Sequence, residues 1–216
     1  MSCGCAWSTI CRSRARSTGK GTALSDEATA ASRLGPGAVA LVVGPSGVGK
    51  DALIAGARAI LAPDPRFAFV TRDITRPAHP SESFAPVTDT EFQVRLARGE
   101  YALSWGAHGL HYGIPRSLDG MIAEGRTAIF NASRMAIPAA LARYASVKVV
   151  LVDCPIEIRA RRMATRGREP EAEIAARLAR RVEDFNVAAA HAVIDNSGSL
   201  EDGVTRLVAA LRSFAR

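Results

Sequence analysis

The feature that most constrains the fold of this chain is a glycine-rich loop beside its first strongly apolar segment. The loop reads Gly44-Pro-Ser-Gly-Val-Gly-Lys-Asp51, follows the apolar run 38–43 and precedes a helical pattern over 51–61. Its glycines let the backbone curl so that several N–H groups point inward, and the following helix adds the partial positive charge of its N-terminus. The pattern predicts a phosphate-binding loop between a buried strand and a helix, with Lys50 reaching the β- and γ-phosphates of a nucleotide.

Asp51 departs from the usual form of this loop, in which a Ser or Thr hydroxyl follows the lysine and binds Mg²⁺. A carboxylate is also a hard oxygen ligand for Mg²⁺, but it adds negative charge near a triphosphate. Two interpretations stay open: Asp51 binds Mg²⁺ directly or through water, or it only caps the start of the helix. We favour the metal role. The expected nucleotide-binding residues are Gly44, Pro45, Ser46, Gly47, Val48, Gly49, Lys50 and Asp51.

Strand and helix patterns alternate along the rest of the chain. Further strand patterns occupy residues 66–71, 101–104, 111–114, 127–130, 147–152 and 192–194. Helical patterns occupy 90–98, 118–123, 133–144 and 200–214, and an arginine-rich helical region from 155 to about 190 is interrupted at 166–170. This alternation predicts an α/β fold of the P-loop NTPase type, with a parallel sheet and helices on both of its faces.

The amino-acid composition bears on the class of ligand that the chain binds. The chain has 216 residues, enough for one domain with its own core, and a net charge of +7. Only three of its 28 basic residues are lysines, and the arginines carry a planar guanidinium that binds phosphate with two parallel hydrogen bonds. The arginines indicate a polyanionic ligand, or only an alanine- and arginine-rich composition. Nucleic-acid binding is not expected, because the basic residues lack interleaved aromatic side chains.

Residues 1–36 differ from the rest in composition. Five basic and two acidic residues stand among small polar ones without a period of 2 or 3.6 residues. We expect a disordered basic extension ahead of a folded domain over 37–216. It is a dispensable extension, a start codon assigned too early, or an organelle transit peptide. Three of the four cysteines lie in this segment and no apolar run approaches the ~18 residues of a membrane span, so the expected location is a reducing cytoplasm.

From Phe69 onward the sequence resembles the guanylate kinase family, and the resemblance covers nearly all of residues 38–214. The matching motifs are the loop 44–50, Thr75-Arg-Pro77, Gly99-Glu-Tyr101 leading into Trp105, His108-Gly109 with Tyr112-Gly113, Arg166-Gly-Arg168 and Arg177-Leu178. The resemblance implies a small acceptor-binding subdomain over about 71–116 and a helical lid over about 156–182 that closes over ATP. It also implies that Arg76 and Tyr112 bind the acceptor phosphate. The implied lid arginines are Arg162, Arg166, Arg168 and Arg177.

Three departures from the guanylate kinase pattern concern the acceptor. His79 stands where that family has a second phosphate-binding arginine, and Ser104 where it has a glutamate that accepts hydrogen bonds from guanine. Asn131-Ala-Ser133 replaces an Asp-x-Asp motif. Without the glutamate the guanine N–H donors stay unsatisfied, at about 1–3 kcal/mol for each buried group. Guanine is therefore not the expected acceptor.

A narrower resemblance accounts for these departures. The loop ending in Gly-Lys-Asp51, Thr75-Arg-Pro-Ala-His-Pro80, the run 105–115 and Asn131-Ala-Ser-Arg134 are similar to the ribose 1,5-bisphosphate phosphokinases, and only Gly106 departs from the pattern of the run. This resemblance implies phosphoryl transfer from ATP to ribose 1,5-bisphosphate. The product is then 5-phospho-α-D-ribose 1-diphosphate (PRPP), within phosphonate utilisation.

The side chains of this stretch suit an acceptor that carries about four negative charges and no base. The expected acceptor-binding residues are Arg72, Arg76, His79, His108, His111, Tyr112, Arg116 and Asn131. His108 and His111 are equally well explained as polar turn residues, and Arg72 as a surface residue of a strand. The expected catalytic residues are Lys50, Arg76, Arg166, Arg168 and Arg177.

The chemical group that accepts the phosphoryl group determines whether the reaction needs a general base. A phosphate monoester is largely ionised at neutral pH, so an acceptor phosphate needs no general base. A kinase that phosphorylates a hydroxyl would need one, and Asp73 is the one local carboxylate for it. Two other functions stay open: a guanylate or other nucleoside monophosphate kinase, and a noncatalytic protein-binding module. The expected partners are ATP with Mg²⁺ and a phosphosugar, with no nucleic acid and no membrane, and the oligomeric state, a homodimer included, is left open.

Overall fold

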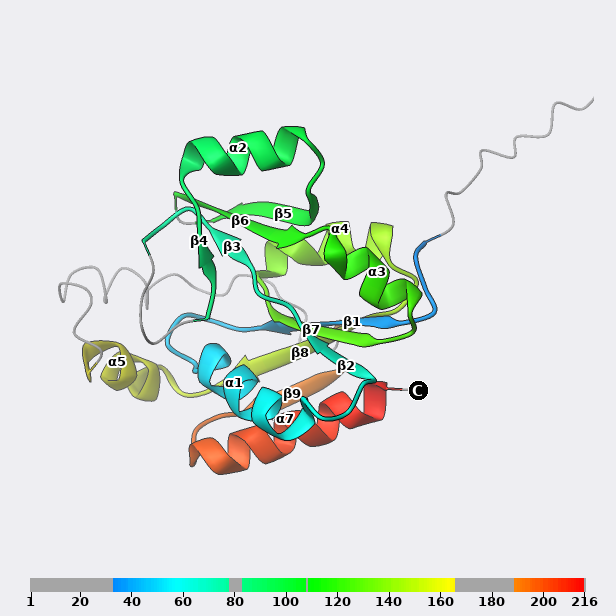
Figure 1. Cartoon of the computed structure of the whole chain (residues 1–216). Coiled ribbons are helices and arrows are strands. Elements are labelled where there is room, and N and C mark those ends of the chain that lie inside the picture. The colour runs from blue at the N-terminus through cyan, green and yellow to red at the C-terminus, as the bar shows by residue number, and fades with distance from the viewer. Residues whose placement is uncertain (1–32, 78–82, 108, 166–188, 216) are drawn as a thin grey trace, which may run out of the picture. The chain divides into compact units, whose positions relative to one another are not determined.

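Two β-sheets organise the residues that the computed structural model describes, which are 33–77, 83–107, 109–165 and 189–215 (Figure 1). The larger sheet is entirely parallel, in the order β2-β7-β1-β8-β9. Its strands are β1 (Ala38–Val43), β2 (Phe67–Phe69), β7 (Thr127–Asn131), β8 (Val147–Asp153) and β9 (Ala192–Asp195). Neighbouring parallel strands require crossover connections, and helices supply them here.

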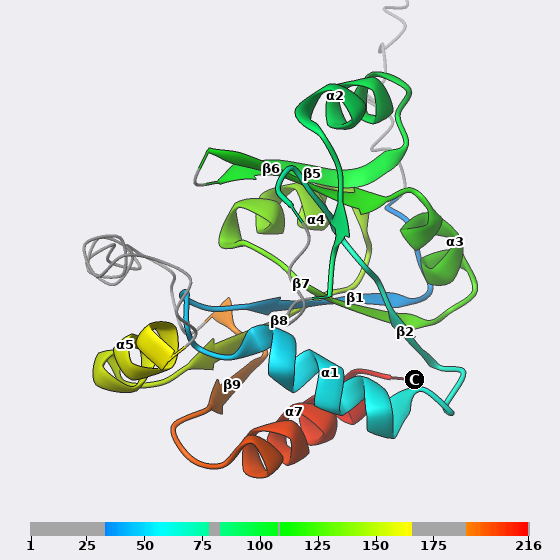
Figure 2. The ribbon, with the colours of Figure 1, turned by 60° about the vertical axis from the view of Figure 1, so that its left-hand side comes forward.

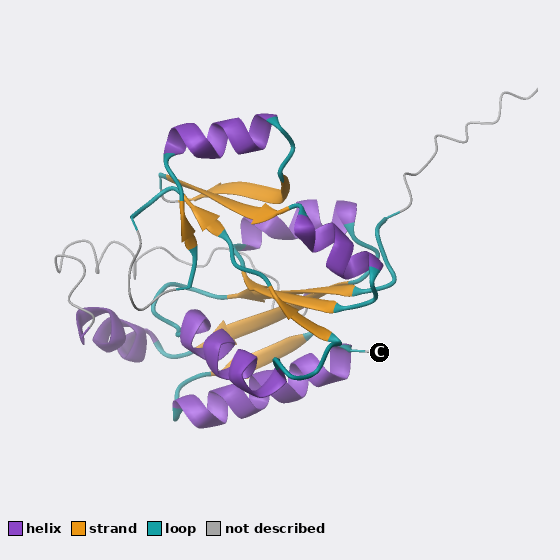
Figure 3. Ribbon diagram, in the orientation of Figure 1, coloured by secondary structure: helices purple, strands orange, loops and turns teal. Residues whose placement is uncertain are grey.

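Helices cover both faces of the parallel sheet (Figure 3). On one face α1 (Lys50–Leu61) and α7 (Leu200–Phe214) lie side by side in both views (Figures 1 and 2). The other face is covered by α3 (Ser117–Ala123), a 3₁₀ turn (Arg134–Ala136) and α4 (Ile137–Arg143), while α5 (Ile156–Thr165) follows β8. None of the helices in the described ranges is long and apolar enough to cross a membrane.

Strand β1 forms the centre of the core. Its alternate residues enter different clusters: Ala40 and Val42 pack with α1 and α7, whereas Val39 and Leu41 pack with α3 and α4. Every residue of β1 is buried, as expected for a strand with both neighbours and both faces covered. The continuous apolar run in the sequence is the direct consequence.

The smaller sheet has the order β4-β3-β6-β5 and is formed by the segment expected to bind the acceptor. Its strands are β3 (Asp73–Ile74), β4 (Ala85–Pro86), β5 (Tyr101–Ala107) and β6 (Leu110–Pro115). Helix α2 (Asp89–Ala97) begins with a capping box between Thr88 and Glu91, and its Phe92 ring stacks on Tyr101 at 4.8 Å. The helix therefore packs on one face of this sheet and leaves the other toward the parallel sheet (Figure 2).

The expected parallel sheet with helices on both faces is confirmed, and most element boundaries agree within a few residues. The two-residue strands β3 and β4 were not expected, because two residues are too few to show a periodic pattern. The helix expected over 133–144 is instead a 3₁₀ turn followed by α4, with Pro138 in its first turn. The helical region expected from 155 begins as α5, and its continuation over 166–188 lies outside the described residues.

The folded body begins before residue 37. Leu34 donates its backbone N–H to the Arg143 carbonyl at 2.9 Å and accepts a hydrogen bond from the Ala145 N–H at 2.8 Å. This backbone pairing beside Tyr144 places residues 34–36 with the body rather than with the expected extension. The remainder of that extension, 1–32, lies outside the described residues.

A half-buried carboxylate, that of Asp119, links α3 to the end of α4. Asp119 accepts hydrogen bonds from the Arg143 guanidinium and from the Tyr144 hydroxyl, and it pairs with Arg116 at 3.0 Å. Burial alone would raise the pKa of Asp119, but the hydrogen bonds from Arg143 and Tyr144 outweigh it and hold the pKa below its usual value. The cluster is structural, and it lies at the end of β6.

Two helical glycines provide a test of the packing between α1 and α7. A Cβ at Gly56 would lie 2.4 Å from a methyl carbon of Val204 on α7, whereas nothing lies within 4 Å of a Cβ at Gly120 on α3. Gly56→Ala is therefore expected to lower the free energy of unfolding by about 1–3 kcal/mol through overpacking. Gly120→Ala is expected to raise it by about 0.4–1 kcal/mol, because alanine restricts the unfolded chain. Urea denaturation of both variants measures the difference, and equal effects would contradict this account of the interface.

Candidate active site

The glycine-rich loop joins the end of β1 to the start of α1. Gly47 and Gly49 have φ angles of 79° and 92°, a region that favours glycine. A Cβ at Gly44 would lie 2.2 Å from the Val152 carbonyl oxygen of β8, so no side chain fits at this position either. The backbone itself therefore forms the wall of the site, next to the N-terminus of α1, which is the arrangement that binds phosphate.

Lys50, the first residue of α1, lies against this loop. Its ammonium group donates hydrogen bonds to the carbonyl oxygens of Gly44 at 2.7 Å and of Pro45 at 3.1 Å. These contacts hold the positive charge beside the loop backbone, where a polyphosphate would share it with the backbone N–H groups.

Asn196, which sequence reasoning did not select, holds the loop from the C-terminal part of the chain. It follows β9 and is 3% exposed, and its Nδ2 donates to the Val48 carbonyl at 2.8 Å. A Cβ at Gly49 would lie 2.6 Å from the same Nδ2, and one at Gly203 on α7 would lie 2.5 Å from Oδ1. Asn196 is a positioning residue for the loop, and no local pattern marks it, because its partner lies 148 residues away.

Helix α5 packs across the same loop. A Cβ at Gly47 would meet the Met163 side chain at 2.9 Å and the Arg159 carbonyl at 3.1 Å. Arg162 lies 3.8 Å from the position of a Cβ at Gly49 and 3.8 Å from the Cys154 sulfur. Burial raises the pKa of the Cys154 thiol, so it stays protonated beside these arginines. Of the implied lid arginines only Arg162 is described here; Arg166, Arg168 and Arg177 lie outside the described residues.

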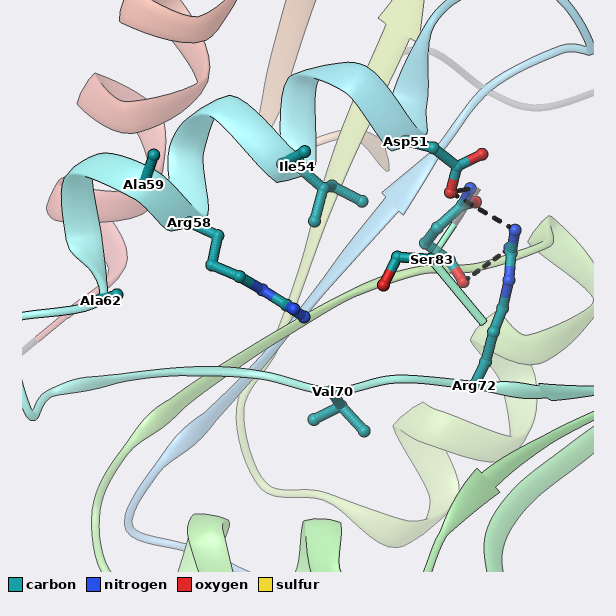
Figure 4. Close-up of a pocket in the computed structure, with 10 residues that line it drawn as sticks. Asp51, Ile54, Arg58, Ala59, Ala62, Val70, Arg72 and Ser83 are labelled. Carbon is teal, nitrogen blue, oxygen red and sulfur yellow. Dashed lines mark hydrogen bonds and ion pairs between the residues drawn. The ribbon is translucent and has the colours of Figure 1, made fainter. Parts of the chain in front are cut away.

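Three polar side chains meet where α1, β7 and the segment before β3 come together (Figure 4). Asn131 donates from Nδ2 to Asp51 Oδ1 at 2.7 Å, and Arg72 lies 3.5 Å from the same oxygen. Arg72 also donates to the Asn131 carbonyl at 3.1 Å, and its guanidinium lies 5.9 Å from the centre of the Tyr112 ring. The Arg72 side chain is only 11% exposed, so it is not a surface residue. We call Asp51, Arg72 and Asn131 the charged cluster.

The geometry bears on the two interpretations of Asp51. The N-cap of α1 is Gly49, so Asp51 is the second residue of the helix, and its Oδ1 accepts hydrogen bonds from Asn131 and Arg72. The Asn131 Oδ1 is buried and has no hydrogen-bond partner among the described residues. Asp51 and Asn131 therefore offer neighbouring hard oxygen atoms, the donors that Mg²⁺ takes together with phosphate and water. The described residues contain no group of three or more His, Cys, Asp or Glu that could hold a metal without such help.

The other acceptor-site candidates divide between two faces of the smaller sheet. Tyr112 stacks on Trp105 at 5.4 Å, on the face toward the parallel sheet, and Arg76 lies 4.8 Å over the Phe84 ring. His111 lies on the opposite face, because neighbouring strand residues point to opposite sides, and it stacks on Phe92 of α2 at 5.2 Å. The structure does not bring His111 together with the charged cluster.

Three further candidates are not placed in the site. Arg116 begins α3, where it pairs with Asp119 and donates to the Gly99 carbonyl at 3.3 Å, so the structure does not bring it to the charged cluster. His79 and His108 lie outside the described residues. The assignment of His79 and His108 to acceptor binding remains a prediction.

Asp73 is buried in the smaller sheet and is hydrogen-bonded to two neighbouring side chains. It is 4% exposed, and its Oδ2 accepts hydrogen bonds from Arg95 and from the Tyr101 hydroxyl, both at 2.7 Å. Burial, reinforced by the hydrogen bond to Asp73, raises the pKa of Tyr101. A carboxylate paired in this way is unsuited to act as a general base for a hydroxyl acceptor.

A cavity of about 380 Å³ adjoins the charged cluster (Figure 4). It lies between α1 and the segment that leads from β2 to β3. The residues that line it are Asp51, Ile54, Ala55, Arg58, Ala59, Ala62, Val70, Arg72, Ser83 and Asn131. The volume is within the range of sites for small ligands, and its basic side chains suit an anionic one.

Comparison of folds identifies the architecture. A crystal structure of guanylate kinase from Anaplasma phagocytophilum matches 84% of this chain and 87% of its own with a TM-score of 0.59, at 19% sequence identity. No family model matches the chain. The glycine-rich loop, the parallel sheet and the adjoining second sheet together define a P-loop α/β fold like that of guanylate kinase.

Proteins of similar sequence identify the family of this chain more specifically than its fold does. Ribose 1,5-bisphosphate phosphokinase PhnN of Rhodopseudomonas palustris is 47% identical over 149 residues, 69% of this chain and 77% of that protein. The proteins of the same name from Methylobacterium radiotolerans and Pseudofrankia inefficax are 42% and 46% identical, each over 82% of this chain and over 99% and 91% of their own lengths. The chain belongs to the ribose 1,5-bisphosphate phosphokinase family.

The position of Asn196 generates a prediction for nucleotide binding. Asn196→Ala leaves the Val48 carbonyl without its buried partner, at a cost of about 1–3 kcal/mol. We expect the KM for ATP to rise about tenfold, while the KM for the phosphate acceptor stays unchanged, because the contact supports only the loop. Steady-state kinetics with each substrate varied in turn measure this split.

Ser197→Ala is the matched control, because Ser197 is the next residue and its hydroxyl contacts only exposed Asp195 among the described residues. This control is expected to retain the parent KM for ATP. An Asn196→Ala variant with the parent KM for ATP would contradict a positioning role.

Proposed function

We propose that this chain transfers the γ-phosphoryl group of ATP to the 1-phosphate of ribose 1,5-bisphosphate. The bond between the γ-phosphorus and its bridging oxygen breaks, a bond from that phosphorus to an oxygen of the 1-phosphate forms, and the products are ADP and PRPP. The observation that carries the proposal is that Asp51, directly after the lysine of the glycine-rich loop, binds Asn131 and Arg72, in a chain whose relatives are ribose 1,5-bisphosphate phosphokinases.

The chemistry requires positioning and charge compensation rather than a base. The attacking oxygen belongs to a phosphate that is already largely ionised at neutral pH. Asp73, the one local carboxylate considered for proton abstraction, is occupied by Arg95 and Tyr101. Two phosphates that repel one another must instead be held in line, and fixed positive groups in a partly desolvated site lower the barrier to that approach.

Donor and acceptor roles are distributed over the two sheets. The backbone of residues 44–49 and Lys50 bind the β- and γ-phosphates of ATP, and Arg72, Arg76 and Tyr112 bind the acceptor phosphate. Arg162, Arg166, Arg168 and Arg177 are the proposed lid arginines that would contact ATP. His79 and His108 are further proposed acceptor residues, whereas His111 and Arg116 contact Phe92 and Asp119 instead and are left out of the proposed acceptor set.

Asp51 and Asn131 are the proposed ligands for Mg²⁺. The buried Asn131 Oδ1 and the Asp51 carboxylate supply hard oxygens at the start of α1, beside the place where the phosphates of ATP lie. A Mg²⁺ ion held by these two side chains would supply positive charge against the phosphates of ATP. Arg72 compensates the charge that Asp51 brings to the site.

The residues of the cavity and of strand β5 do not favour phosphorylation of a nucleoside monophosphate. The residues that line the cavity include two arginines and one carboxylate, Asp51, which is already hydrogen-bonded to the charged cluster. Ser104, at the position of the guanine-binding glutamate, is exposed on β5 opposite Gly113. In the part of the chain that the structure describes, the cavity therefore has no carboxylate without other partners, and the position of Ser104 has no carboxylate at all, to accept hydrogen bonds from the N–H groups of guanine.

The first prediction from the proposed function concerns the choice of acceptor. With ATP and Mg²⁺ present, we expect ribose 1,5-bisphosphate to support release of ADP and GMP to support none above the rate without acceptor. Coupled detection of ADP together with ³¹P NMR of the product measures both the rate and the new diphosphate. Turnover of GMP alone would overturn the proposed function.

The second prediction concerns Asp51. Asp51→Asn keeps the size of the side chain and removes its charge, so the Mg²⁺ concentration for half-maximal rate is expected to rise by about tenfold or more. Asp51→Ser supplies the hydroxyl that most loops of this type carry, and is expected to lower that concentration again relative to Asp51→Asn. Titration of Mg²⁺ at saturating ATP measures both. Parent-like Mg²⁺ dependence in the two variants would refute a metal role.

A further inference from the structure

We infer that Arg58, on α1, binds the second phosphate of the acceptor, the 5-phosphate, and so makes the site selective for a bisphosphorylated pentose. The inference rests on the proposed function and adds a residue to its acceptor site. It comes from the shape of the cavity and from the position of its two arginines, neither of which is evident in the sequence.

The cavity follows α1 away from the phosphate-binding loop. Asp51 lines one end and Arg58, seven residues later, lines it two helical turns further on. Seven residues correspond to about 10.5 Å along the helix axis and return to nearly the same side of the helix. Figure 4 shows Arg58 extending from α1 toward the space between this helix and the segment that carries Val70 and Arg72.

The direction of phosphoryl transfer decides which phosphate lies at which end. The 1-phosphate must meet the γ-phosphate of ATP, so it belongs beside Lys50 and the charged cluster at the start of α1. The rest of the acceptor then extends along the cavity toward Arg58. The wall between the two ends is formed by Ile54, Ala55 and Val70, which provide apolar contact for the carbon atoms of a pentose, and by the Ser83 hydroxyl.

Arg58 retains hydrogen-bonding capacity for an anion. Its guanidinium lies 5.4 Å from the centre of the Phe69 ring and donates one long hydrogen bond, of 3.5 Å, to the Phe69 carbonyl. Within the described part of the chain it forms no ion pair with a carboxylate. A guanidinium has five N–H donors, and stacking on Phe69 fixes its plane without using them. The charge is therefore oriented at the cavity wall but not neutralised there.

Substitution of Arg58 tests the inference when two acceptors are compared. Ribose 1-phosphate has the reacting phosphate and lacks the 5-phosphate. We expect Arg58→Gln to lower kcat/KM for ribose 1,5-bisphosphate about 10- to 100-fold, as loss of a charge-assisted hydrogen bond does, and to leave kcat/KM for ribose 1-phosphate within about twofold. The KM for ATP should not change, because Arg58 lies away from the loop.

Arg66→Gln is the matched control. Arg66 also stacks on a phenylalanine, with its guanidinium 5.8 Å from the Phe67 ring, but it pairs with Asp64 and does not line the cavity. It is expected to show the parent kinetics with both acceptors.

A second pair of variants reaches the same end of the cavity without altering Arg58. Ala59 is exposed and lines the cavity, whereas the next residue, Ile60, is exposed and does not. Ala59→Glu is expected to raise the KM for ribose 1,5-bisphosphate at least about fivefold by repulsion of the 5-phosphate and to spare ribose 1-phosphate. Ile60→Glu adds the same charge outside the cavity and is expected to have no effect on either.

The outcomes separate the inference from the function on which it rests. If the parent protein does not phosphorylate ribose 1,5-bisphosphate, the proposed function fails. If it does, and Arg58→Gln and Ala59→Glu both leave its kcat/KM unchanged, the role of Arg58 is refuted. Equal losses with the two acceptors would also refute it, because they indicate a structural effect, which thermal unfolding of each variant reports directly.

Discussion

Every part of the active site depends on how closely the backbone of residues 44–49 approaches the elements around it. A side chain at Gly44 would overlap a carbonyl of β8, and one at Gly49 would overlap the Asn196 amide. Because these approaches exclude side chains, the loop presents backbone to a ligand, and three separate elements (β8, α5 and the end of β9) hold it in place. The fully buried strand β1 anchors its start at the centre of the parallel sheet.

Electrostatics connects this loop to other parts of the chain. Asp51 is the second residue of the helix that follows the loop, and its carboxylate binds Arg72 from the segment before β3 and Asn131 from the end of β7. Removing charges from water is unfavourable unless they are paired, so the ion pair and the amide hold each other in one arrangement. The start of α1, the segment before β3 and the end of β7 are consequently joined through one hydrogen-bonded carboxylate rather than positioned independently.

Sequence reasoning performed best where local patterns coincide with tertiary roles. The buried strand β1, the loop and α1 were all expected at nearly their observed positions, since burial on both faces and an N–H cradle each leave a local trace. It performed worst where two residues suffice for a strand, as in β3 and β4, and where strand alternation decides the face of a side chain. His111 and Tyr112 are adjacent in the sequence, but His111 stacks on α2 while Tyr112 lies near Arg72.

The sequence by itself determined the class of fold and the family, because a glycine-rich loop between strand and helix and the motifs around 75–80 and 105–115 are local and can be recognised in one dimension. Only the tertiary structure decided which of the many arginines serve which purpose. Arg72 pairs with Asp51, Arg116 pairs with Asp119, and Arg58 lines the cavity beside α1. Their chemistry is identical, and what distinguishes them is burial and neighbours from distant parts of the chain, which no local pattern encodes.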